Sequence, residues 1–285
     1  MELSYFAQIA VNSLVLASTY ALIAVGLTLV FGLMNVVNFA HGEFYMMGAF
    51  VLYYLTTGLG LNYLLSSVLV IGSMGFLGMG VERFLFRRLR NDPSSMLILA
   101  IAISSIFQHS FLLIFGPDDR VLNPVLRGTI RIFGVSLSEA RLVVIIVGIV
   151  LISASALFLR KSKIGMAMRA VAQDEEASSL RGVNVSHIRL MGMGIGCSLA
   201  AAASVAVVHL FTINPYIGSQ YLMKAFIIVI VGGLGSFSGS ILGGALLGVL
   251  DGFGLALIGY PAHIVGFVVV FLLLVFRRRG IWGHD

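Results

Sequence analysis

The feature that most constrains this chain is a series of apolar segments, several of which reach the roughly 20 residues needed to cross a lipid bilayer. Of the 285 residues, 59% are hydrophobic and only 11% are charged. A soluble domain of this size cannot keep so many apolar side chains from water. The sequence therefore predicts an all-α polytopic membrane protein with one transmembrane domain over residues 1–285.

Basic residues gather in three short segments between the apolar runs, and these segments orient the chain. They hold most of the 18 Lys and Arg residues and span 83–90, 160–189 and 277–279. By the positive-inside rule all three segments are cytoplasmic. Membrane topology therefore accounts for the formal net charge of +6, and nucleic-acid binding is not needed to explain it. The expected contact of the chain is with membrane lipid.

The apolar runs predict about eight to nine crossings of a bacterial cytoplasmic (inner) membrane, some of them broken helices. Charge parity places the N-terminus outside and the C-terminus in the cytoplasm. We expect a cytoplasmic loop over about 160–189 and a periplasmic loop over about 116–141. Within the periplasmic loop, apolar and polar residues alternate over 127–137, which is compatible with a small hairpin or with an irregular loop. The expected spans are 5–34, 45–57, 61–81, 95–115, 142–159, 188–211, 223–231, 241–258 and 263–276.

The two halves of the chain share a weak internal pattern. In each half a long apolar helix is followed by an interrupted segment, NFAHGEFYMMGAFV or INPYIGSQYLMKAFIIV, and then by a glycine-rich span. The halves enter the membrane from opposite sides, so the pattern indicates an inverted repeat with a substrate path at its interface. The alternative is that glycine-rich membrane segments merely look alike.

The polar stretch 160–192 is the main water-facing surface of the chain, and it predicts two short helices. Asp174 can cap the second helix, which runs to about Arg181 and stops at Gly182. The first helix carries apolar residues on one face, which we expect to pack back on the spans: Ile164, Met168, Val171 and Ala172.

A set of co-linear motifs covers nearly the whole chain. In order they are TYALIAVGLTLVFG with NFAHGEFYMMGAF, ERFLFRRLR, KIGMAMRAVAQDEEASSLRGVN, INPYIG with KAF, and VGGLGSFSGSILGG. Together they resemble the permease subunit of branched-chain amino acid ABC importers, the LivH-type family. One departure is FRRRGIWG near the C-terminus, which keeps the glycine of the family's final segment but has arginines before it; we expect it to affect docking or lipid contact only.

The resemblance implies partners: a second, LivM-like permease, two cytoplasmic ABC ATPase subunits and a periplasmic substrate-binding protein. The chain has no GxxxxGK[ST] loop, so ATP and Mg are expected on the ATPase subunits, and no cofactor, metal or catalytic residue is expected here. The acidic residues of the second short helix are explained either by the helix dipole or by contact with an ATPase. The residues expected to couple to the ATPase are Asp174, Glu175, Glu176, Ser178, Leu180, Arg181 and Gly182.

Polar residues at the two interrupted segments are candidates for a substrate path or gate, because ionisable groups at membrane depth are costly. Asn38, His41 and Glu43 are expected near the cytoplasmic end of the first span, as an inner gate or as a hydrogen-bonded elbow. On the outer side, the candidates for contact with a substrate carboxylate or for interfacial anchoring are Asn214, Tyr216, Gly218 and Lys224. Asp251 is the deepest-looking carboxylate, which requires a partner or a water-filled crevice.

The resulting function is half of an importer's translocation path for branched-chain amino acids, driven by partner ATPases through a cytoplasmic coupling helix. The same architecture also serves urea, short amides or other amino acids in related permeases. An ion-coupled secondary transporter or channel is a further alternative, with His41, Glu43 and Asp251 as its candidate coupling groups. An intramembrane enzyme would need a convergent set of catalytic groups, which the sequence does not offer.

Overall fold

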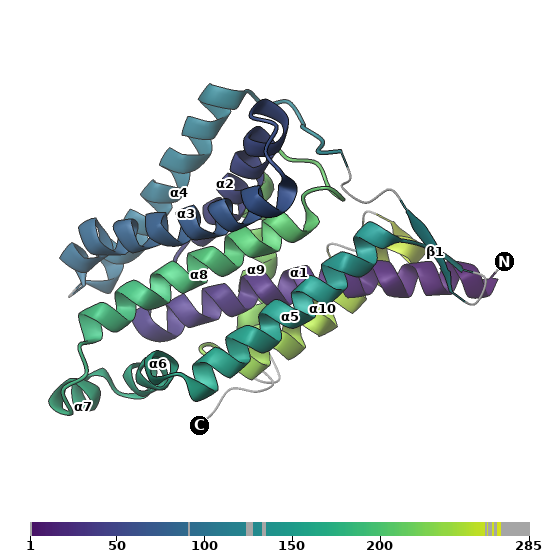
Figure 1. The fold of residues 1–285 in the computed structure, drawn as a ribbon. Coiled ribbons are helices and arrows are strands. Elements are labelled where there is room, and N and C mark those ends of the chain that lie inside the picture. Colours follow the sequence, from purple (N-terminus) through teal and green to yellow (C-terminus); the bar gives the residue numbers. More distant parts are fainter. Residues whose placement is uncertain are drawn as a thin grey trace.

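The computed structural model describes residues 2–90, 92–123, 128–132 and 135–259, together with 261, 264, 267 and 268. Its long helices form the body of the protein (Figure 1). Within the described residues six helices are long and apolar enough to cross a membrane. They are α1 (Glu2–Met34), α3 (Tyr63–Phe84, continued to Leu89 by the 3₁₀ turn η2 at Phe86–Leu89), α4 (Pro93–Phe115), α5 (Glu139–Lys161), α8 (Val185–Val207) and α10 (Phe237–Ile258).

Two shorter apolar helices replace two of the expected spans. α2 (His41–Tyr53) is extended by the π turn η1 (Tyr54–Gly58), and α9 covers Ile217–Gly232. The fold class is therefore confirmed, with short helices at both interrupted segments. The expected last span, 263–276, falls almost wholly outside the described residues.

Both short helices begin earlier than expected because asparagine side chains turn the chain just before them. Asn35 takes a left-handed backbone angle, φ 52, and the Asn38 side chain accepts a hydrogen bond from the Ala40 N–H at 3.1 Å. The Asn214 side chain likewise accepts from the Tyr216 N–H at 3.0 Å. In such turns the asparagine side chain hydrogen-bonds the backbone two residues further on and so replaces a backbone hydrogen bond. As a result the helix after each break already includes His41 or Ile217.

The inverted repeat is visible in reciprocal contacts between equivalent helices. A Cβ atom on Gly26 of α1 would lie 2.8 Å from the Gly196 carbonyl oxygen of α8, and one on Gly196 would lie 2.9 Å from the Gly26 oxygen. Gly42 of α2 and Gly218 of α9 meet in the same reciprocal way. Only glycine lets two backbones approach so closely. α10 packs along α1 as α3 packs along α8, so each half of the chain has the same arrangement.

The loop expected to be periplasmic contains a hairpin, one of the two conformations that the alternation in 127–137 allowed. β1 (Thr129–Ile132) pairs antiparallel with β2 (Val135–Ser138), with Thr129 opposite Ser138. The loop is tied to the segment before α9, because Arg120 and Ile213 exchange backbone hydrogen bonds and the Asn214 amide donates to Asp119 at 2.9 Å.

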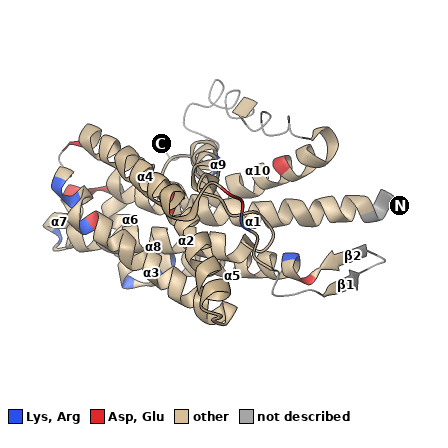
Figure 2. Cartoon of the chain, turned by 90° about the horizontal axis from the view of Figure 1, so that it is seen from above, with Lys and Arg blue, Asp and Glu red and all other residues tan. Residues whose placement is uncertain are grey.

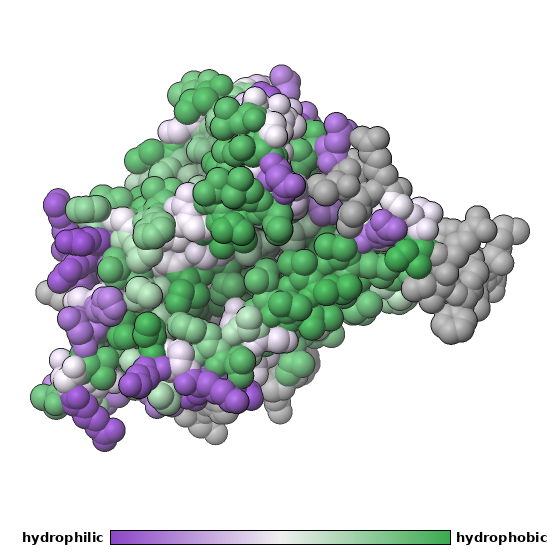
Figure 3. All heavy atoms as spheres, viewed as in Figure 1, coloured by the Kyte–Doolittle hydropathy of each residue, from purple (hydrophilic) through white to green (hydrophobic). Residues whose placement is uncertain are grey.

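The opposite end of the bundle carries the two predicted short helices, α6 (Lys163–Gln173) and α7 (Glu175–Leu180). Met168 and Val171 of α6 are buried against Leu29, Leu33 and Ile188, among other residues of the bundle. Ala172, expected on the same face, is exposed instead because it lies at the edge of that contact, beside Gly32. Hydrophilic residues gather at this end, whereas hydrophobic residues cover the sides of the bundle (Figure 3).

Candidate functional site

The first candidate site is the coupling surface, which we define as α7 with Asp174, Arg181 and Gly182. The helix forms as its sequence predicts. The Asp174 carboxylate accepts from the Ala177 N–H at 2.9 Å, and Gly182 ends the turn with φ 84. An acidic N-cap with Glu175 and Glu176 in the first turn also complements the helix dipole.

The residues of the coupling surface divide into an inward and an outward face. Ser178 is buried against the bundle. Leu180 is 85% exposed, so its side chain faces away from the bundle. The other outward residues are Asp174, Glu176, Ser179, Arg181 and Gly182.

Glu175, expected to meet an ATPase, instead holds α7 to the rest of the protein. Its carboxylate pairs with Arg189 of α8 at 2.5 Å and also with Arg90, which follows α3. Partial burial, followed by the like charge of Arg189, lowers the pKa of the Arg90 guanidinium from its ordinary value, and Glu175 supplies a negative charge between the two. Lys, Arg, Asp and Glu are concentrated at this end of the bundle, around α6 and α7 (Figure 2). These ion pairs connect α7 to α8 and to the α3–α4 connection.

The second candidate site is a buried ion pair, Lys224 of α9 with Asp251 of α10, which we call the central pair. The Lys224 Nζ lies 2.6 Å from the Asp251 Oδ2, and the Tyr20 hydroxyl of α1 donates to the same oxygen at 2.8 Å. Asp251 is only 1% exposed. The buried Asp251 carboxylate was expected to need a partner, and that partner is Lys224. Tyr20 lies near the midpoint of α1.

A cavity of about 470 Å³ adjoins the central pair. Tyr20, Tyr221, Gln220 and Lys224 supply its polar groups, and the rest of its wall is apolar. This size is within the roughly 300–1,000 Å³ typical of small-molecule sites. A few polar groups in an otherwise apolar wall is also the usual composition of such sites.

The predicted path residues of the first interrupted segment lie deeper than expected. His41 and Glu43 are fully buried, and the His41 ring lies against Gly26, roughly two helical turns before the end of α1. His41 therefore lies inside the bundle near that end of α1, because the turn at residues 35–40 returns the chain into the bundle before α2 begins. Glu43 accepts a hydrogen bond from the Ser104 hydroxyl of α4 at 2.9 Å.

The structure does not gather the predicted path residues into one site. Asn38 belongs to the turn before α2, and Asn214 to the turn before α9, where its amide donates to Asp119. Tyr216 is about half exposed at the start of α9, while Gly218 meets Gly42 at the helix crossing. Among the seven predicted path residues, only Lys224 reaches the cavity. Tyr20 was not predicted as a site residue, although a tyrosine in the middle of a long apolar helix indicates a buried polar contact.

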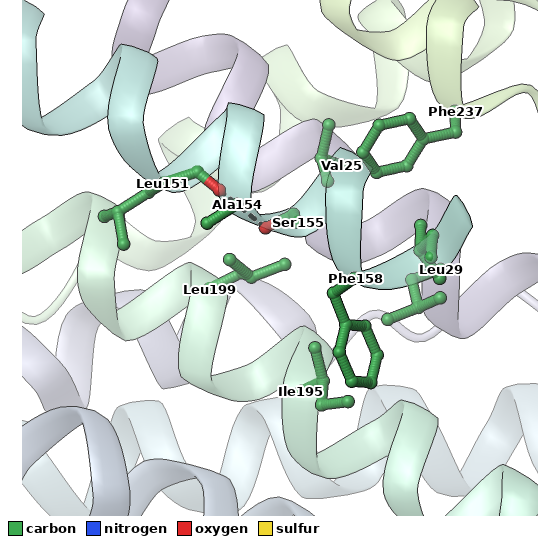
Figure 4. A pocket seen from close by; sticks show the side chains of 10 residues that line it. Val25, Leu29, Leu151, Ala154, Ser155, Phe158, Ile195, Leu199 and Phe237 are labelled. Atoms are coloured by element: carbon green, nitrogen blue, oxygen red, sulfur yellow. Dashed lines mark hydrogen bonds between the residues drawn. The ribbon is translucent and has the colours of Figure 1, made fainter. Parts of the chain in front are cut away.

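A second hollow is purely a packing feature. It measures about 260 Å³ and lies between α1, α5, α8 and the start of α10, lined by Val25, Leu29, Phe158 and their neighbours (Figure 4). The Ser155 hydroxyl at its edge already donates to the Leu151 carbonyl oxygen at 2.7 Å. No polar group is left there to orient a polar ligand. Among the described residues, His, Cys, Asp and Glu form no group of three suited to a metal ion.

Comparison with known proteins decides between the candidate protein classes. The profile described as "Branched-chain amino acid transport system / permease component" matches residues 9–276. The chain belongs to this permease family. The permease is 34% identical to the high-affinity branched-chain amino acid transport system permease protein BraD of Pseudomonas aeruginosa, over 99% of this chain and 97% of that protein.

Further relatives agree with this assignment. The permease is also 34% identical to the LivH permease protein of Escherichia coli K12, over 98% of this chain and 96% of LivH. The predicted LivH-type resemblance is thus confirmed. A solved structure, PsaBC from Streptococcus pneumoniae in complex with Fab, has the same fold, with a TM-score of 0.53 and 14% identity over 97% of this chain and 96% of that chain.

Proposed function

We propose that this permease forms half of the translocation path of an ABC importer for branched-chain amino acids, and that partner ATPases drive it through α7. The observation that carries the proposal is the two-sided geometry of the coupling surface. One face, with Leu180 and Arg181, is free for a partner, while Glu175 on the other face holds α8 and the α3–α4 connection. A contact on the outer face therefore moves the helices of the bundle.

The proposed assembly contains a second, LivM-like permease, two cytoplasmic ATPase subunits and a periplasmic binding protein. α4 and α5 support a partner in the membrane, because most of their apolar surface is left uncovered by the described part of the chain. ATP and Mg are bound by the ATPase subunits. The N-terminus is placed outside and the coupling surface inside, which agrees with the basic residues near α6 and α7.

The proposed substrate path runs through the cavity beside Lys224, at the interface of the two repeats. Glu43 and Gly218 lie together at the α2–α9 crossing, and we assign them with His41 to the packing that positions α2 and α9 beside the path. Asn38, Asn214 and Tyr216 are assigned to the two turns that position α2 and α9.

Reconstitution tests the proposal directly. The permease is co-purified with its native partners, placed in liposomes with the binding protein, and assayed for leucine import with ATP, without ATP, and with a non-hydrolysable analogue. We expect import only with ATP. Import by the permease alone along an ion gradient would refute the proposal in favour of a secondary transporter.

A further inference from the structure

The central pair is placed where an ion pair is not needed for stability. Burying two opposite charges costs about as much as their attraction returns, so two apolar side chains would pack at least as well. Charged groups at membrane depth are therefore functional candidates by default. Lys224 lies halfway along α9, and Tyr20, which shares its partner Asp251, lies near the midpoint of α1.

The pair also belongs to only one half of the repeat. Gly42 meets Gly218 and the ring of Tyr45 stacks on Tyr221 at 4.3 Å, so both contacts relate positions 176 residues apart (218 − 42 and 221 − 45). The same offset places Gly48 opposite Lys224 in the repeat (224 − 48). The shared scaffold is thus built without a charge at this position in the first half.

Lys224 is accessible from the cavity, whereas one oxygen of the Asp251 carboxylate is unpaired among the described residues. The Lys224 side chain is 12% exposed and lines the cavity. Within the described residues the Asp251 Oδ1 has no hydrogen-bond partner, although the oxygen is buried. Tyr20 holds Asp251 through its hydroxyl and lies under Lys224, with the Nζ 5.9 Å from the ring centre. Asp251 is therefore fixed even when Lys224 moves.

We propose that the central pair is a binding site for a zwitterionic α-amino acid, which inserts between Lys224 and Asp251 and takes over both charges. The substrate carboxylate binds Lys224, and its ammonium group binds Asp251. This inference rests on the proposed function and deepens it by assigning the groups that recognise the charged ends of the amino acid.

The balance of charges in the site favours a zwitterion over other ligands. Separating the pair in a water-poor environment is costly unless each charge keeps an opposite partner. A zwitterion provides one partner for each without changing the net charge. An anion or a cation would leave one protein charge unmatched, and a neutral amide or urea would match neither.

The apolar wall of the cavity suits the remainder of such a substrate. Leu16, Phe211, Met223 and Leu255 supply apolar lining of the cavity. An aliphatic amino acid side chain directed at this wall is removed from water and contacts only apolar groups. The site thus combines two charges for the amino acid backbone with an apolar surface for its side chain.

Ligand competition on the wild-type complex tests the charge requirement. The full importer, with second permease and ATPases but without the binding protein, is placed in lipid nanodiscs and tested for binding of labelled L-leucine. Competitors are L-leucinamide, which lacks the carboxylate, and 4-methyl-2-oxopentanoate, which lacks the ammonium group. We expect unlabelled leucine to compete and each analogue to be weaker by about tenfold or more. Competition by leucinamide equal to leucine, or absence of leucine binding at millimolar concentrations, would overturn the proposal.

Variants separate a binding site from a structural ion pair. We expect Lys224→Met, Asp251→Asn and the double variant Lys224→Met with Asp251→Leu each to lose leucine binding by about tenfold or more. The double variant buries no unpaired charge, so its folding is checked by its elution as a single assembled complex. Ser219→Ala, on the same helix but outside the cavity lining, is the control and should change binding less than the charge variants. Wild-type binding by the double variant would show that the pair is structural.

The outcomes also separate this inference from the proposed function. A wild-type complex that imports leucine with ATP while the double variant imports equally well refutes the binding site alone. A wild-type complex that binds leucine as expected but never imports it with ATP and the binding protein refutes the proposed function alone.

Discussion

Replacing Glu175 by glutamine should loosen α7 from the bundle while leaving its outer face unchanged. Glu175 is the only acidic side chain that the structure pairs with Arg189 and Arg90 in the described part of the chain. Glutamine has nearly the same size and keeps a hydrogen-bonding oxygen. The substitution therefore removes the charge and little else.

The size of the effect follows from the exposure of the three side chains. Arg189 is 9% exposed, so its bond to a charged partner is worth about 1.5–3 kcal/mol before screening. Glu175 is 36% and Arg90 29% exposed, which reduces the value of both pairs toward the roughly 0.2–1 kcal/mol of surface ion pairs. Allowing for the weaker bond that glutamine retains, we expect a loss of about 1–2 kcal/mol, which is roughly a 5- to 30-fold shift toward detached α7.

Hydrogen–deuterium exchange of the peptide containing α7, measured on the assembled importer in nanodiscs, reports this shift. We expect its protected amides to exchange roughly 5- to 30-fold faster in Glu175→Gln, and leucine imported per ATP hydrolysed to fall in the same variant. Glu176→Gln is the control, since Glu176 is exposed and the structure gives it no ion pair among the described residues. Equal exchange and coupling in Glu175→Gln and the wild type would refute the reasoning, as would the same loss in Glu176→Gln.

Two further substitutions test the fold. Gly218→Ala should lower stability by about 1–3 kcal/mol, because the new Cβ would lie 2.6 Å from the Gly42 carbonyl oxygen. Thermal unfolding in detergent measures this, with Gly80→Ala, where the space is open, as the control; equal midpoints would contradict the predicted clash. Asp174→Ala removes the cap of α7 and should cost about 1 kcal/mol of helix stability. Faster exchange confined to the α7 peptide would support this, and unchanged exchange would show that the cap contributes nothing.

The sequence predicts those parts of the protein that depend on neighbouring residues. The cap at Asp174, the stop at Gly182 and the buried face of α6 with Met168 all follow from local spacing, and the structure confirms them. Long apolar runs likewise identify the six long helices, because the membrane requires a length that few other structures need.

Contacts between distant segments are not available from such patterns. Tyr20 and Asp251 are separated by 231 positions, and nothing near either residue indicates the other. The inward turn of Glu175 depends on where Arg90 and Arg189 are placed by α3 and α8. The depth of His41 similarly depends on the turn before α2, which can leave the next helix at the membrane surface or within the bundle.

The account's central claim is that the outer face of α7 meets an ATPase while α6 packs on the bundle. Crosslinking tests it in the assembled importer, with Cys197→Ala as the background and single cysteines from Leu180→Cys and Met168→Cys compared. We expect crosslinks to an ATPase subunit from position 180 and none from position 168, where the native side chain is 1% exposed. Crosslinks from position 168 alone would contradict the account and reverse the two faces.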